Sequence, residues 1–90
     1  MITVLVADDQ MMIREAVTRI LTGRDGITVV GHAVDGADAI TQATRLRPDV
    51  IVMDIRMPVL DGIAATSHIC AVPTLTHTRV LVLTTFEEDE

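Results

Sequence analysis

Short apolar segments alternate with longer amphipathic segments along this 90-residue chain, and this alternation constrains the fold more than any other feature. The apolar segments are rich in Val, Ile and Leu, which is typical of strands that are buried on both faces of a sheet. The predicted strands are Ile2–Ala7, Ile27–Val34, Asp49–Met53 and Arg79–Leu83. The segments between them repeat apolar residues every three or four positions, as helices that pack one face on a sheet do. The predicted helices are Gln10–Thr22, Ala37–Leu46 and Ile63–Val72.

The order of these elements is βαβαβαβ, which predicts an α/β fold with a doubly wound parallel sheet and helices on both of its faces. Right-handed crossovers restrict the possible topologies, and one that they allow has the strand order 2-1-3-4. No linker or internal repeat interrupts the pattern, so residues 1–90 are predicted to form one domain.

The composition excludes several classes of protein. The unbroken apolar runs, such as Val50–Met53, are far shorter than the roughly 18–20 residues of a membrane span. Cys70 is the single cysteine, so an internal disulfide is impossible; we expect a cytoplasmic protein in which Cys70 is a small core residue. The net charge is −6 and all seven basic residues are Arg, without a basic cluster, so the chain alone is a poor candidate for nucleic-acid binding.

Polar residues follow three of the four predicted strands. Asp8 and Asp9 follow the first strand, Asp54 follows the third, and Thr84 follows the fourth. In open parallel sheets, ligands bind at the carboxyl ends of the strands, where the strand order reverses. The order 2-1-3-4 makes the first and third strands neighbours, so the three aspartates are predicted to converge in one crevice.

Three carboxylates in one crevice repel each other unless a cation lies among them. Mg²⁺ is the natural cation for such a site because it prefers oxygen ligands and retains several waters. A carboxylate beside bound Mg²⁺ can attack a phosphoryl group and become an aspartyl phosphate, and a hydroxyl such as that of Thr84 can then donate to the new phosphoryl oxygens.

Taken together in this order, these residues resemble the receiver domain of bacterial two-component response regulators. The resemblance extends from residue 1 to residue 90, and its last segment is most similar to the LuxR/NarL-type subgroup, whose members carry a C-terminal helix-turn-helix DNA-binding domain. No part of such a domain is found in these 90 residues. The fold implied is flavodoxin-like. The family resemblance rests on Val6–Gln10, Val52–Pro58, Asp61–Gly62 and Val82–Phe86, and the subgroup resemblance rests on Leu83–Glu87.

The resemblance implies a role for each residue of the acidic crevice. Asp54 would be the phosphoacceptor. Asp9 would bind Mg²⁺ directly or through water, with Asp8 in the same pocket. Arg56 would contribute its main-chain carbonyl to the metal, while its side chain would not be a ligand.

The resemblance also implies how the domain signals. Thr84 would be the switch hydroxyl that moves toward the phosphoryl group, and Pro58 and Gly62 would shape the loop above the site. Asp61 is expected to cap the third helix. The implied partners are a sensor histidine kinase as phosphoryl donor, a second copy in a homodimer, and DNA only through a domain absent here; no membrane partner is expected.

The sequence departs from the family pattern after the fourth strand. Receiver domains are about a third longer than this chain, and they carry a Lys after a fifth strand; this chain contains no Lys and stops at Glu90, where the fourth helix is expected. We therefore expect an exposed edge at the fourth strand and an incompletely covered first helix, with Ile13, Val17 and Leu21 exposed. Phosphorylation of this chain alone is expected to be weak or absent, because a charge-offsetting cation is missing.

Two alternative functions are consistent with the same fold. An interaction or dimerisation module that is never phosphorylated would fit the missing Lys and the missing last elements. A Mg²⁺-dependent phosphatase with an aspartyl nucleophile is less consistent, because such enzymes place a second Asp two residues after the nucleophile. Arg56 occupies that position here.

Overall fold

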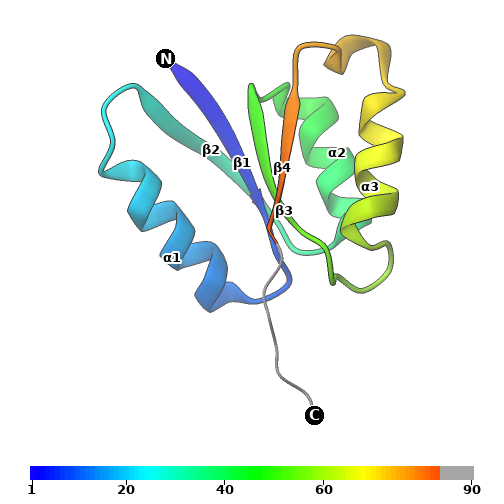
Figure 1. Ribbon diagram of the computed structural model, residues 1–90, viewed down its shortest axis with the longest axis horizontal. Coiled ribbons are helices and arrows are strands. Elements are labelled where there is room, and N and C mark those ends of the chain that lie inside the picture. The colour runs from blue at the N-terminus through cyan, green and yellow to red at the C-terminus, as the bar shows by residue number, and fades with distance from the viewer. Residues whose placement is uncertain (84–90) are drawn as a thin grey trace.

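Four parallel strands form one sheet in the order β2-β1-β3-β4, with α1 on one face and α2 and α3 on the other (Figure 1). This computed structural model describes residues 1–83, so the predicted switch residue Thr84 lies outside the described residues. The strand order and the parallel α/β architecture confirm the predicted fold class.

The elements follow the predicted order with small shifts at their ends. A short 3₁₀ helix, Pro73–Leu75, was not predicted from the sequence and lies between α3 and β4. The third helix ends at Cys70, earlier than predicted, because Val72 already precedes the 3₁₀ helix as its N-cap and Pro73 is the first residue of that helix. The strands are β1 (Ile2–Ala7), β2 (Ile27–Ala33), β3 (Val50–Asp54) and β4 (Arg79–Leu83), and the helices are α1 (Met11–Thr22), α2 (Gly36–Leu46) and α3 (Gly62–Cys70).

The two faces of the sheet are covered unequally. Alternate residues of β1 point to opposite faces, as the period of a strand requires. The face under α2 and α3 contains the larger buried cluster, which includes Leu5, Ile51, Met53, Ile69 and Leu75. The face under α1 contains a small buried cluster of three residues, Val4, Val6 and Val52.

Helix α1 is the least buried of the three helices. None of its residues is fully buried, and the predicted apolar stripe is narrower than expected, since Ile20 is exposed. Val17 and Leu21 are half-buried against the smaller cluster, and Ile13 is also half-buried, so the expectation that these three residues are exposed was wrong. Contacts of α1 with β1 and β2 shield one side of the apolar stripe from solvent.

The described structure also settles the environments of Cys70 and of the edge strand β4. Cys70 is exposed at the end of α3, so its assignment to the core was wrong; Ile69 occupies the buried position of that turn. Strand β4 pairs with β3 alone among the described residues, and Leu81 is exposed on it. Within residues 1–83, no helix has the length and apolar character needed to cross a lipid bilayer.

Candidate functional site

The three aspartates predicted from the strand ends lie together at the carboxyl edge of the sheet. Strands β1 and β3 are paired in register up to Ala7 and Met53, so the next residues, Asp8 and Asp54, lie side by side. One carboxylate oxygen from each of Asp8, Asp9 and Asp54 lies within 4.8 Å of the other two. We refer to these three residues as the acidic cluster.

Asp8 is held by the turn that joins β1 to α1. Its side chain is buried, and its Oδ1 accepts a hydrogen bond of 2.9 Å from the main-chain N–H of Gln10. Its main-chain carbonyl accepts a hydrogen bond of 2.8 Å from Nη1 of Arg14, one turn into α1. Asp9, by contrast, is exposed, so the cluster opens to solvent on its side.

Asp54 is the last residue of β3 and is 6% exposed. Its Oδ1 atom is buried and has no hydrogen-bond partner among the described residues. Buried carboxylate oxygens without a partner are rare because desolvation is costly. A Mg²⁺ ion ligated by carboxylates would satisfy this atom, so the residues present fit such a cation.

Burial and mutual repulsion shift the ionisation of two members of the cluster. Burial raises the pKa of Asp54, and the negative charge of Asp8 raises it further, against the hydrogen bond from the main-chain N–H of Arg56. Burial likewise raises the pKa of Asp8, and the hydrogen bond from Gln10 opposes this rise. The cluster therefore holds its charge at a cost in free energy, which a bound cation would relieve.

The loop between β3 and α3 passes close to Asp54. Gly62 donates its N–H to the carbonyl of Ile55 at 2.8 Å, and a Cβ atom at Gly62 would overlap the carbonyl oxygen of Asp54. Pro58 is exposed, and the next residue, Val59, has a φ of 71°, which is uncommon for a β-branched residue. Only glycine allows the loop to approach the end of β3 so closely.

Of the three remaining residues with a predicted role, one is confirmed and two are untested. Asp61 caps α3, because its Oδ1 accepts the N–H of Ala64 at 2.8 Å, so that prediction is confirmed. The side chain of Arg56 is exposed, and its carbonyl as a metal ligand stays a prediction. The switch role of Thr84 is also untested, since it falls outside residues 1–83.

Arg14 belongs to the surroundings of this site although no sequence motif indicates it. Arg14 lies six residues after Asp8 and reaches back to its main-chain carbonyl. A main-chain acceptor leaves no mark in the sequence, so only the spacing of a helix that starts directly after the turn could have indicated the contact.

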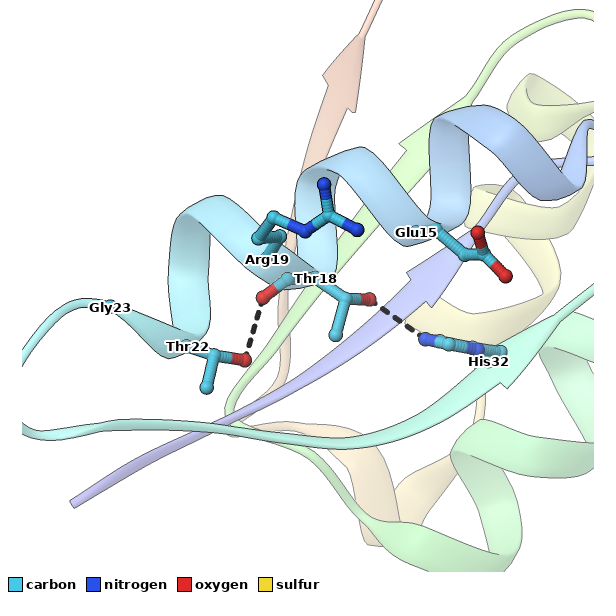
Figure 2. Close-up of a pocket in the computed structure, with 6 residues that line it drawn as sticks. All are labelled: Glu15, Thr18, Arg19, Thr22, Gly23 and His32. Carbon is cyan, nitrogen blue, oxygen red and sulfur yellow. Dashed lines mark hydrogen bonds between the residues drawn. The ribbon is translucent and has the colours of Figure 1, made fainter.

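A separate surface hollow of about 640 Å³ lies between α1 and β2 (Figure 2). It is lined by Glu15, Thr18, Arg19, Thr22, Gly23 and His32, and it does not include the acidic cluster. Thr18 donates its hydroxyl proton to the carbonyl of Arg14 at 2.7 Å, so it accepts from Nε2 of His32 at 2.8 Å. The hollow is open and its hydroxyl protons are already used, so the chemistry of the site belongs to the acidic cluster.

The fold and the acidic cluster are both found in a known protein family. The sequence pattern of the response regulator receiver domain matches residues 4–90, nearly the whole chain. This chain belongs to the receiver domain family. The match begins within β1 at Val4 and covers β3 and the residues of the acidic cluster, so the features that predicted the family from sequence lie inside the matched region.

Relatives of this receiver domain belong to proteins with different outputs. Transcriptional regulatory protein LiaR of Bacillus subtilis is 41% identical over 90 residues, which cover all of this chain and 42% of LiaR. Protein-glutamate methylesterase/protein-glutamine glutaminase 3 of Pseudomonas syringae pv. syringae is 52% identical over 68 residues, which cover 76% of this chain and 18% of that protein. The chain thus spans less than half of either relative.

A solved structure supports the subgroup that the sequence predicted. The signal receiver domain of the response regulator NarL from Mycobacterium tuberculosis superposes with a TM-score of 0.82 at 38% identity. The superposition covers 97% of this receiver domain and 68% of that chain. The resemblance to LuxR/NarL-type receivers is therefore confirmed.

Proposed function

We propose that this receiver domain accepts a phosphoryl group on Asp54 and relays the resulting charge to an output. The observation that carries the proposal is the buried Oδ1 of Asp54, which has no hydrogen-bond partner in the described part of the chain although it lies against two further carboxylates. A structural carboxylate would be hydrogen-bonded at that depth. An oxygen kept free of partners is available to react or to bind a cation.

Asp54 is better suited to be the acceptor than either of its neighbours. Oδ1 of Asp8 is already engaged by the N–H of Gln10, and Asp9 is exposed at the rim. Asp9 and Asp8 would hold Mg²⁺ together with Asp54, and the carbonyl of Arg56 would complete the protein ligands. When bound, Mg²⁺ would neutralise the charge of the phosphoryl oxygens and the carboxylates.

The main contribution of the protein to the reaction is to position the carboxylate of Asp54. A carboxylate oxygen of Asp54 forms a bond to phosphorus while the bond from phosphorus to the ring nitrogen of a donor phosphohistidine breaks, and that nitrogen keeps the electron pair. The close approach of Gly62 to the Asp54 carbonyl fixes the main chain from which the nucleophile projects. The Thr84 hydroxyl would then hydrogen-bond the phosphoryl group, and Pro58 and Gly62 would shape the loop above it.

The partners and the output follow from the same proposal. A sensor histidine kinase in the cytoplasm would be the donor, and the readout would be homodimerisation and promoter binding through a DNA-binding domain outside these residues. The match to a transcriptional regulator over the whole chain supports this output. We propose that the domain is a substrate of phosphoryl transfer and not an enzyme; the methylesterase relative matches over only 18% of its length.

An intact mass spectrum before and after treatment with acetyl phosphate and Mg²⁺ tests the proposal. We expect slow gain of one phosphoryl group by the wild-type chain and none by Asp54→Asn. Asp49→Asn is the matched control, since Asp49 precedes the same strand at its opposite end, and it should be labelled like the wild type. Labelling should also stop when EDTA removes Mg²⁺.

Two outcomes would contradict the proposal. Labelling that persists in Asp54→Asn would place the acceptor elsewhere. A wild-type chain that binds Mg²⁺ but never gains mass, from acetyl phosphate or from a phosphorylated kinase domain, would favour the interaction module that is never phosphorylated.

A further inference from the structure

We propose that Arg14 is a positioning residue that holds the turn between β1 and α1 so that Asp8 and Asp9 present their carboxylates to a divalent cation. This inference rests on the proposed Mg²⁺ site. It concerns a side chain that lies on α1, outside the acidic cluster, and that touches the cluster through a main-chain atom.

The turn is closed by a small set of hydrogen bonds. Nη1 of Arg14 donates to the carbonyl of Asp8 at 2.8 Å, and the N–H of Gln10 donates to Oδ1 of the same residue at 2.9 Å. Gln10 precedes α1, but its side chain makes no capping hydrogen bond. The guanidinium of Arg14 therefore links the first turn of the helix to the end of β1, where a cap would otherwise fix the entry of the chain.

The main chain of Arg14 is also linked to the sheet by hydrogen bonds through α1. Its side chain is half-buried, and its main-chain carbonyl accepts the hydroxyl proton of Thr18 at 2.7 Å. Oγ1 of Thr18 in turn forms a hydrogen bond of 2.8 Å with Nε2 of His32 on β2 (Figure 2). The turn that carries the two aspartates is thus connected through α1 to a second strand of the sheet.

Charge and position predict opposite effects for the loss of Arg14. Its positive charge lies close enough to Asp8 to favour the ionised carboxylate, and the same charge repels an incoming cation. If charge alone mattered, removing Arg14 would tighten Mg²⁺ binding. If Arg14 positions the turn, removing it weakens binding although the local charge becomes more favourable, since partners that orient metal ligands contribute about 10–100-fold to affinity.

Mg²⁺ titration of the 90-residue chain, followed through ¹⁵N–¹H NMR resonances, separates the two effects. We expect Arg14→Met to weaken Mg²⁺ binding by about tenfold. Arg14→Lys keeps the charge but not the planar fork, and it should weaken binding by a smaller factor. Arg19→Met removes the same charge from an exposed position of the same helix and should leave the affinity within about twofold, the small effect expected of a screened surface charge.

A second measurement does not depend on the metal. In metal-free protein, hydrogen exchange at the Gln10 N–H should accelerate in Arg14→Met and stay at the wild-type rate in Arg19→Met, because the turn loosens only in the former. If the NMR spectrum of Arg14→Met lacks the dispersion of a folded protein, Mg²⁺ affinity and hydrogen exchange are measured on Arg14→Lys instead.

The outcomes distinguish this inference from the proposed function. Unchanged or tighter Mg²⁺ binding in the Arg14 variants, or unchanged exchange at Gln10, would overturn the inference and leave the Mg²⁺ site intact. Absence of Mg²⁺ binding by the wild-type chain would overturn the Mg²⁺ site and with it the cation-positioning role, whereas Gln10 exchange would still report whether Arg14 holds the turn.

Discussion

Two aspartates lie at opposite ends of β3, five residues apart, and they differ in their hydrogen-bond partners. Asp49 immediately precedes the strand and Asp54 is its last residue. Asp49 Oδ2 accepts hydrogen bonds from the main-chain N–H of Thr3 at 2.9 Å and from its hydroxyl at 3.2 Å. Oδ1 of Asp54 has no partner among the described residues.

The ionisation of the two residues reflects this difference. The hydrogen bonds from Thr3 lower the pKa of Asp49, so its charge stabilises the fold. Burial and the charge of Asp8 raise the pKa of Asp54, so its charge destabilises the fold. An aspartate at each end of β3 thus makes hydrogen bonds at the amino edge of the sheet and keeps one oxygen without a partner among the described residues at the carboxyl edge. A buried carboxylate whose pKa is raised by burial and by a neighbouring carboxylate is a sign of function, because stability alone would not retain it.

The largest expected effect comes from a change at the carboxyl edge. Gly62→Ala places a Cβ atom against the main-chain carbonyl of Asp54, so the end of β3 or the start of α3 must move. We expect a loss of about 2–3 kcal/mol in the free energy of unfolding, measured by urea denaturation followed by circular dichroism. Mg²⁺ affinity should fall as well, because the displaced main chain carries Asp54.

Gly23→Ala is the control for this prediction. A Cβ atom at Gly23 would lie 3.7 Å from the carbonyl oxygen of Ile20, which is an ordinary contact. If Gly62→Ala is as stable as Gly23→Ala and binds Mg²⁺ normally, the loop does not constrain the carboxyl edge.

A smaller loss of stability is expected from the amino edge. Thr3→Val removes the hydroxyl that donates to Asp49 Oδ2 and also accepts the N–H of Asp49 at 3.0 Å. We expect the free energy of unfolding to fall by about 1–2 kcal/mol, because the hydroxyl makes two hydrogen bonds and each typically contributes about 1 kcal/mol. Mg²⁺ affinity should not change, because the acidic cluster lies at the opposite edge.

Thr28→Val makes the same chemical change at an exposed position of β2, where the hydroxyl donates to the weak acceptor Sδ of Met1, and it should alter stability by less than about 0.5 kcal/mol. A change of Mg²⁺ affinity in Thr3→Val would contradict the independence of the two edges.

The smallest expected effect is a pH-dependent change of the free energy of unfolding, compared between Asp54→Asn and Asp49→Asn in the absence of Mg²⁺. A raised pKa means that folded Asp54 binds its proton more tightly than the unfolded chain does, so its contribution to stability falls as pH rises between the ordinary Asp value and the raised value. Asp54→Asn should therefore be more stable than the wild type at neutral pH. This gain should disappear in acid below the ordinary pKa of Asp.

Asp49→Asn should behave in the opposite sense. Its lowered pKa means that the charge contributes stability above the ordinary Asp value, and this contribution is lost as pH falls through the lowered pKa. The variant should be less stable than the wild type at neutral pH and approach it in acid. Thermal unfolding at several pH values measures both variants; shifts of the same sign at neutral pH would refute the comparison.

Much of the fold and of the acidic cluster was predictable from the sequence. The alternation of apolar strands with amphipathic helices predicted the four strands and the three long helices, because strand and helix periods are local properties of a sequence. The order 2-1-3-4 is not a local property, and it was predicted from the resemblance to receiver domains. Parallel strands end at one edge, so Asp8, Asp9 and Asp54 could be placed together without knowledge of any side-chain contact.

The tertiary structure decided which of these groups lose water and which find partners. Periodicity did not show that Cys70 would be exposed, nor that the stripe of α1 would be only half-buried. The pairing of Thr3 with Asp49 joins residues 46 positions apart, and the contact of Arg14 uses a main-chain acceptor. Sequence patterns predict the elements and their faces, whereas solvent exclusion and hydrogen bonding between distant residues arise only when those elements pack together.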